Sequence, residues 1–154
     1  MFTKSNICRR NIYMNKIFID TDVILDLLLN RHPFSSSSMK LFTLVEEKDV
    51  AAYTSPVVLA NIYDISAKLT DKKSALKHIR KLLTLMRIAV VNEKIMLLAA
   101  NSSFKDFKDS IQYFSAKNER IGFFITRNKK DYKVTDLTVC TPEEYLTVYH
   151  HPSN

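Results

Sequence analysis

Acidic side chains stand next to short apolar segments at three separate places in this sequence, namely Asp20, the pair Asp106 and Asp109, and Asp131. Several carboxylates cannot share a pocket while ionised unless a cation neutralises them. Oxygen ligands of this kind suit Mg²⁺ or Mn²⁺, and the histidines and cysteines form no set with the spacing of a zinc site. If these acids converge, we expect a cation that lowers the pKa of a bound water and stabilises charge on a phosphodiester.

Each acid also has a purely structural interpretation. Asp20 would cap the following helix, although Asp22 is equally well placed to do so. Asp106 and Asp109 would stabilise the start of a helix through its dipole alone. Asp131 is most simply a loop acid among lysines. Only the complete set, combined with the fold, favours a metal site.

The stretch IFIDTDVILDLLL at 17–29 contains three aspartates with different expected roles. We expect Asp20 to bind metal because it ends an apolar strand. Asp22 is expected to support the site without ligating metal. For Asp26 we expect a helix-surface residue or a local pairing partner.

The elements that must position these residues alternate along the chain. Apolar segments at 17–19, 50–53, 88–91, 122–125 and 137–140 predict strands, and the segments at 23–29, 39–45, 56–69, 74–87, 93–102, 106–116 and from 141 predict helices. The serines at 35–38 are interpreted as a loop and N-cap. This alternation predicts a three-layer α/β sandwich with a central, mainly parallel sheet of four to five strands flanked by helices. Ligands of such sheets bind at the carboxyl ends of the strands, where Asp20, Thr126 and Asn128 fall.

Length and composition limit the other possibilities. The chain has 154 residues, of which 46% are hydrophobic, so one domain with a single core is expected. We assign residues 1–15 to an N-terminal extension, 16–148 to the domain and 149–154 to a C-terminal tail. The only glycine, Gly122, excludes a glycine-rich phosphate loop. A formal net charge of +7 favours a polyanionic partner such as RNA.

The sequence contains no apolar run long enough for a signal peptide or a membrane span. Cys8 and Cys140 show no ligand spacing and are expected to be free thiols. These observations predict a soluble, cytoplasmic protein that does not bind membranes.

Four stretches, in order, resemble the motifs of the PIN-domain family, whose metal-dependent ribonucleases include the toxins of bacterial toxin–antitoxin pairs. The resemblance extends from Lys16 to about Leu146 and rests on FIDTDVILDLL, TSPVVLANIYDI, DFKDSIQYFSA and FFITRNKKDY. It implies that Asp20, Asp109 and Asp131 bind Mg²⁺ or Mn²⁺, with Asp106 as an accompanying acid of the metal site. It thereby implies hydrolysis of RNA by metal-activated water.

Two positions depart from the family pattern. Asn61 stands where members commonly carry glutamate, and Asn128 where many carry aspartate, so the site loses negative charge and should bind Mg²⁺ more weakly. We expect Asn61 to position water, Asn128 to assist, and Thr126 to support the site by hydrogen bonding. The alternative is a catalytically weakened PIN-fold module that binds RNA or another protein.

Basic and aromatic residues suggest how a substrate would be held. Arg127, Lys129 and Lys130 surround the fourth motif and are expected to contact RNA phosphates. Tyrosines such as Tyr113 and Tyr132 would stack on bases, although such residues are more often core or dimer contacts. The resemblance also implies a small antitoxin as a partner, and we expect a homodimer.

Overall fold

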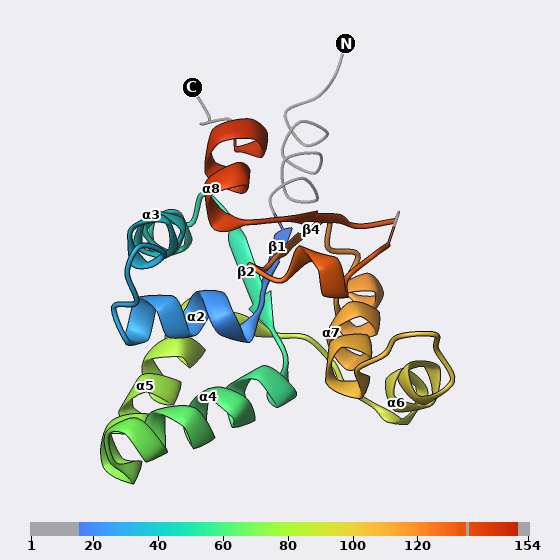
Figure 1. Cartoon of the computed structure of the whole chain (residues 1–154), viewed down its shortest axis with the longest axis horizontal. Coiled ribbons are helices and arrows are strands. Elements are labelled where there is room, and N and C mark those ends of the chain that lie inside the picture. Colours follow the sequence, from blue (N-terminus) through green and yellow to red (C-terminus); the bar gives the residue numbers. More distant parts are fainter. Residues whose placement is uncertain (1–15, 135, 151–154) are drawn as a thin grey trace.

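Five parallel strands form the central layer of the structure, a computed structural model that describes residues 16–134 and 136–150. They are β1 (Lys16–Ile19), β2 (Ala51–Thr54), β3 (Arg87–Ile88), β4 (Phe123–Ile125) and β5 (Thr138–Cys140), in the spatial order β3-β2-β1-β4-β5. Helices cover the sheet on both sides, with α2 and α3 on one side and α6 and α7 on the other (Figure 1). The predicted α/β sandwich with a parallel sheet is therefore confirmed.

The helices follow the predicted order. They are α2 (Thr21–Leu28), α3 (Ser35–Glu46), α4 (Pro56–Leu69), α5 (Lys72–Leu85), α6 (Glu93–Ala100), α7 (Phe107–Asn118) and α8 (Pro142–Glu144). A short 3₁₀ turn, η1 (Lys129–Asp131), follows β4, and a π-helical turn, η2 (Tyr145–Tyr149), follows α8. Helices α4 and α5 pack together as an antiparallel pair at one end of the molecule (Figure 1).

Side-chain caps begin most of these helices. Ser55 accepts a hydrogen bond from the Val58 N–H and is followed by Pro56 at the first helical position, as the sequence predicts. Asp71, Asn92 and Asp106 cap α5, α6 and α7 in the same way. Because each cap immediately precedes an apolar-periodic segment, most helix boundaries can be read from the sequence.

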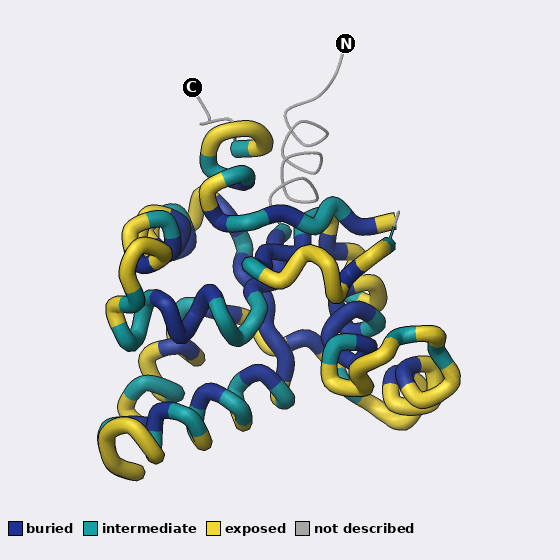
Figure 2. Tube along the Cα trace, in the orientation of Figure 1, coloured by how far each residue is buried: buried dark blue, intermediate teal, exposed yellow. Residues whose placement is uncertain are grey.

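The hydrophobic core lies on both faces of β1 and β4, the strands at the centre of the sheet. Phe18 and Phe124 stack with their ring centroids 4.9 Å apart, and Ile17, Ile19 and Ile125 are fully buried. Figure 2 shows that burial follows the strands and the inner faces of the helices. A strand covered on both faces is apolar where it is buried, so Ile17–Ile19 of β1 carry no polar side chain and Asp20 is the first polar residue after them.

The serine run was interpreted wrongly as a loop. Ser35–Ser38 form the first turn of α3, which begins after Phe34 without a side-chain cap, and Ser35 and Ser38 are buried. Packing against the core overrides the weak helix preference of serine. The third strand is also shorter than predicted, since only Arg87–Ile88 of that region pair with β2.

In the part of the chain that the structure describes, no helix is long and apolar enough to cross a membrane. Cys140 is a buried free thiol. The predicted extension at 1–15, which includes Cys8, and residues 151–154 of the predicted tail lie outside the described residues.

Candidate active site

Adjacent strands bring Asp20 and Thr126 together at the carboxyl edge of the sheet. Ile19 of β1 is in register with Ile125 of β4, so the next residue of each strand lies at the same edge. The Thr126 hydroxyl donates a hydrogen bond of 3.0 Å to Asp20 Oδ2. The other oxygen, Oδ1, accepts the N–H of Thr21 at 2.8 Å and caps α2. Asp20 therefore caps a helix while keeping one carboxylate oxygen among the site residues.

Helix α7 contributes the second acid. The Asp106 side chain caps α7 by accepting the Asp109 N–H at 3.1 Å. The Asp109 carboxylate accepts a 3.0 Å hydrogen bond from the Tyr132 hydroxyl, which also lies 3.5 Å from Asp20 Oδ2. Tyr132 thus connects two acids that are far apart in the sequence. From its sequence, Tyr132 is expected to stack on bases or to pack in the core, and the role of its hydroxyl was not predicted, although its position directly after Asp131 is a usable signal.

Burial and mutual repulsion make it unfavourable for all the acids of this cluster to be ionised together. Burial, together with the negative charges of Asp22 and Asp109, raises the pKa of Asp20 from 3.8 to about 7, although hydrogen bonds from Thr21 and Thr126 oppose this rise. Burial also raises the pKa values of Asp22 and Asp109. Burial and the neighbouring acids raise the pKa of Tyr132, so its hydroxyl stays protonated and remains a donor. A cation would relieve this accumulation of negative charge.

A solvent-filled hollow adjoins the cluster and contains the other predicted acid. Asp106, Asp109 and Asp131 all line this hollow of about 410 Å³, together with Lys130 and Lys133. Asp131 is exposed, and it lies in the 3₁₀ turn η1 immediately before Tyr132. The hollow therefore combines carboxylates with ammonium groups that could approach a polyanion.

The acids of this region carry the donor atoms that a divalent cation needs. Asp20, Asp109 and Asp131 offer hard carboxylate oxygens, which suit Mg²⁺ or Mn²⁺. Within residues 16–134 and 136–150, no three His, Cys, Asp or Glu side chains are already gathered closely enough to hold a metal ion. The donor atoms and the charge thus fit a hard cation, although the described side chains do not surround a single position.

Arg127 and Asp26 form an ion pair beneath the site. Arg127 Nε and Nη2 donate to the two oxygens of Asp26 at 2.6 and 3.0 Å, and the Asp26 side chain is fully buried. The guanidinium carbon also lies 4.0 Å from the centre of the Phe34 ring. The prediction of a surface residue or a local partner at Asp26 is wrong, because its partner is 101 residues away. Arg127 stays partly exposed, but these contacts occupy its Nε and Nη2 and leave fewer of its donors for the predicted contact with RNA.

Asp22 fixes the loop that follows β4. Its Oδ2 accepts the backbone N–H of Arg127 at 2.9 Å and lies 3.4 Å from the Thr126 hydroxyl. The Thr126 hydroxyl in turn accepts the N–H of Asn128 at 3.1 Å. Asp22 and Thr126 thus hold the loop after β4 in place, which agrees with the supporting roles expected of them.

The two asparagines have different surroundings. Asn61, on α4, accepts a 3.5 Å hydrogen bond from Lys108, the residue before Asp109. Asn128 is exposed and begins the turn that carries Asp131. Of the neighbouring lysines, Lys129 pairs with Glu144 at 2.7 Å, and Lys130 lines the acidic hollow.

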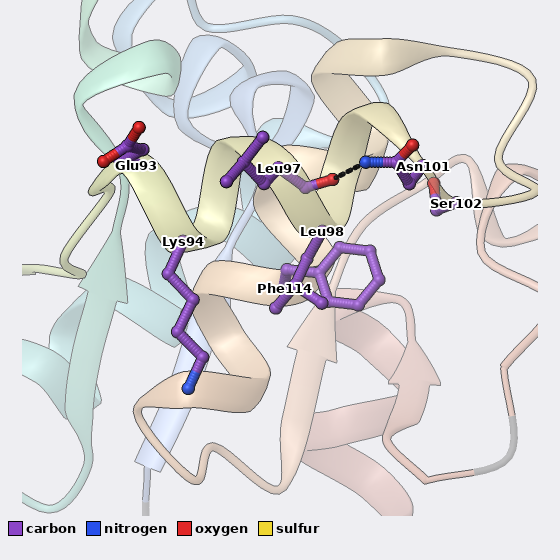
Figure 3. Close-up of a pocket in the computed structure, with 7 residues that line it drawn as sticks. All are labelled: Glu93, Lys94, Leu97, Leu98, Asn101, Ser102 and Phe114. Carbon is purple, nitrogen blue, oxygen red and sulfur yellow. Dashed lines mark hydrogen bonds between the residues drawn. The ribbon is translucent and has the colours of Figure 1, made fainter.

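A second hollow has a different chemistry. It lies between α6 and α7 and is lined mainly by apolar groups such as Leu97, Leu98 and Phe114 (Figure 3). The Asn101 amide there donates a 2.8 Å bond to the carbonyl oxygen of Leu97 (Figure 3). Glu93 is the single acid among its lining residues, so this hollow lacks the several carboxylates that a divalent cation requires.

The raised pKa of Asp20 predicts how the stability of the metal-free protein depends on pH. The contribution of Asp20 is fully present below its ordinary pKa of 3.8 and is lost as the pH rises through its folded-state value of about 7. We expect the free energy of unfolding to fall by roughly 2–3 kcal/mol between pH 5 and pH 8 from this residue alone. Urea unfolding at several pH values, in the presence of EDTA, measures this change in the free energy of unfolding. Asp20→Asn should show a clearly flatter profile, and an equal slope in both proteins would contradict the prediction.

The protein is thus an α/β domain whose parallel sheet carries a cluster of carboxylates at the carboxyl ends of its central strands. The chain is a member of the PIN-domain family, because the family model for the PIN domain matches residues 16–130. The resemblance inferred from the four motifs is therefore confirmed.

Relatives with known names or structures agree with this assignment. Ribonuclease VapC1 from Aquifex aeolicus is 29% identical over 135 residues, which cover 84% of this chain and 92% of VapC1. Among solved structures, VapBC2 from Rickettsia felis bound to a promoter DNA fragment superposes with a TM-score of 0.62 at 18% identity, covering 82% of this chain and 98% of that chain. The sarcin-ricin loop cleaving toxin VapC20 from Mycobacterium tuberculosis gives 0.61 at 15% identity, covering 79% and 98%. These structures share the fold with this chain.

Proposed function

We propose that this protein is a metal-dependent endoribonuclease that hydrolyses RNA phosphodiester bonds and acts as the toxin of a toxin–antitoxin pair. The observation that carries the proposal is the convergence of Asp20 and Asp109 at the hydroxyl of Tyr132, with Thr126 hydrogen-bonded to Asp20. Similarity to a protein named ribonuclease VapC1 supports the same activity.

Each site residue has a task in this proposal. Asp20, Asp109 and Asp131 would hold Mg²⁺ or Mn²⁺, with Asp106 beside them. When bound, such a cation supplies an activated water and offsets charge on the phosphodiester. The Thr126 hydroxyl holds the Asp20 carboxylate in place through its 3.0 Å hydrogen bond.

The remaining predicted residues would handle water and substrate. Asn61 and Asn128 would orient water by their amide groups, since a neutral amide can donate and accept hydrogen bonds. Lys129 and Lys130 would contact RNA phosphates. Arg127 would add to these contacts only through donors that Asp26 does not use.

A small antitoxin is the proposed protein partner. The similar structures include a toxin–antitoxin complex from Klebsiella pneumoniae, which supports a partner of this kind. A homodimer stays a prediction, as does a cytoplasmic location.

RNA cleavage tests the proposed activity directly. The wild-type protein, incubated with a structured RNA, is expected to produce internal cuts in the presence of Mn²⁺ and none after addition of excess EDTA. Restoration of cleavage by surplus Mn²⁺ would support the metal requirement. Cleavage that continues unchanged in EDTA would contradict it, and so would the absence of cleavage at millimolar Mn²⁺.

The second candidate function is an RNA-binding or protein-interaction module without turnover. Two observations favour it: the neutral side chains of Asn61 and Asn128, and the separated acids among the described residues. Calorimetric titration with Mn²⁺ separates the two candidates. RNA binding without any Mn²⁺ binding at millimolar concentration would favour the module.

A further inference from the structure

Tyr132 is a core residue, and the packing of its ring does not require the hydroxyl group. Only 3% of the residue is exposed, and its ring lies 4.3 Å from that of Phe124 and 6.2 Å from that of Phe104. A phenylalanine would make the same ring contacts. The hydroxyl therefore requires an explanation other than hydrophobic packing.

The hydroxyl lies between acids that come from different elements. It is 3.0 Å from Asp109 Oδ1, on the first turn of α7, and 3.5 Å from Asp20 Oδ2, at the end of β1. A tyrosine hydroxyl has one proton to donate, and the shorter distance directs it to Asp109. Asp20 Oδ2 already receives the Thr126 hydroxyl, so each acid has its own donor.

The orientation of the Asp109 carboxylate depends more on Tyr132 than the orientation of the Asp20 carboxylate does. Asp20 is fixed by two bonds from Thr21 and Thr126, both within its own edge of the sheet. Asp109, on the first turn of α7, borders the open hollow, and its side chain is only partly buried. The Tyr132 hydroxyl is the side-chain donor that the structure places on its carboxylate, within the described residues.

We propose that Tyr132 is a positioning residue of the metal site, whose hydroxyl holds the Asp109 carboxylate towards Asp20 so that both face one cation. This inference rests on the proposed metal-dependent function. Hydrogen bonds to ligating carboxylates fix their orientation, and losing such a partner typically costs about 10- to 100-fold in metal affinity or activity. A bond that is already in place before the cation arrives also reduces the cost of ordering the ligands.

Tyr132→Phe tests the inference, because it removes one oxygen and keeps the ring. We expect calorimetric Mn²⁺ affinity to fall by about 10-fold or more. The matched control is Tyr113→Phe, since the Tyr113 hydroxyl also donates to a carboxylate, that of Asp136 at 2.7 and 2.8 Å, away from the cluster. Its Mn²⁺ affinity should stay within about twofold of wild type, as expected for a change outside the ligand shell. Thermal melts in EDTA establish that both variants fold.

A second measurement distinguishes positioning from general damage. If Tyr132 acts on the cation site, RNA cleavage by Tyr132→Phe should recover towards the wild-type rate as Mn²⁺ is raised to saturation. Equal or tighter Mn²⁺ binding by Tyr132→Phe would overturn the inference while leaving the proposed function intact. Absence of Mn²⁺ binding by the wild-type protein would overturn both.

Discussion

Replacing Asp20 with asparagine is expected to reduce Mn²⁺-dependent RNA cleavage by about 100-fold or more, because loss of a proposed ligand should exceed the 10- to 100-fold cost of losing a ligand's hydrogen-bond partner. The amide oxygen of asparagine can replace Oδ1 and accept the Thr21 N–H, while its NH2 group can donate to the Thr126 hydroxyl oxygen, so the end of β1 and the start of α2 should keep their geometry. What disappears is the negative charge. The measurement is the initial rate of RNA cleavage at a fixed Mn²⁺ concentration.

Asp49→Asn is the matched control for this experiment. Asp49 is exposed and precedes β2, so it lies at the amino ends of the strands, opposite the cluster. The same loss of charge there should leave the cleavage rate within about twofold of wild type, as expected for an exposed residue with no part in the site. Full activity of Asp20→Asn, or an equal loss in both variants, would refute a ligand role for Asp20.

The fold was predictable because the relevant signals are local. Most strands are short apolar runs, and most helices start at a capping residue close to the predicted position, as at Ser55 and Asp106. Parallel strands put their carboxyl ends at one edge, so the order of acids along the chain was enough to place Asp20 beside Thr126. The error at Ser35–Ser38 has the opposite cause, since burial of Ser35 and Ser38 against the core is a tertiary effect.

Side-chain pairing within the site was much less predictable. The Tyr132 hydroxyl reaches Asp109 on α7 from the end of the turn that follows β4, and no local pattern encodes that approach. Asp26 has helical spacing suited to a surface position, yet it is buried against Arg127. The sequence predicts which elements meet at the edge, whereas the identity of each hydrogen-bond partner depends on rotamers and loop paths that it does not specify locally.

Removing the positive partner of the buried ion pair is expected to be the most destabilising change near the site. Arg127→Met would leave the carboxylate of Asp26 buried and unpaired, which should lower the free energy of unfolding by roughly 3–5 kcal/mol. Urea denaturation at pH 7 measures the loss. Lys129→Met is the control, because its pair with Glu144 is exposed and should contribute little to stability.

The double variant Asp26→Leu/Arg127→Met shows whether the loss comes from an uncompensated charge. Replacing a complete buried pair with apolar side chains is often neutral, so the double variant should recover most of the stability that Arg127→Met loses. Its coupling energy should therefore be large, of the order of 2–3 kcal/mol. Additive losses in the double variant would instead mean that the two side chains stabilise the protein independently, through packing such as the contact of Arg127 with Phe34. Because Arg127 directly follows Thr126, a strongly coupled pair would also link the stability of the core to the position of the hydroxyl that holds Asp20.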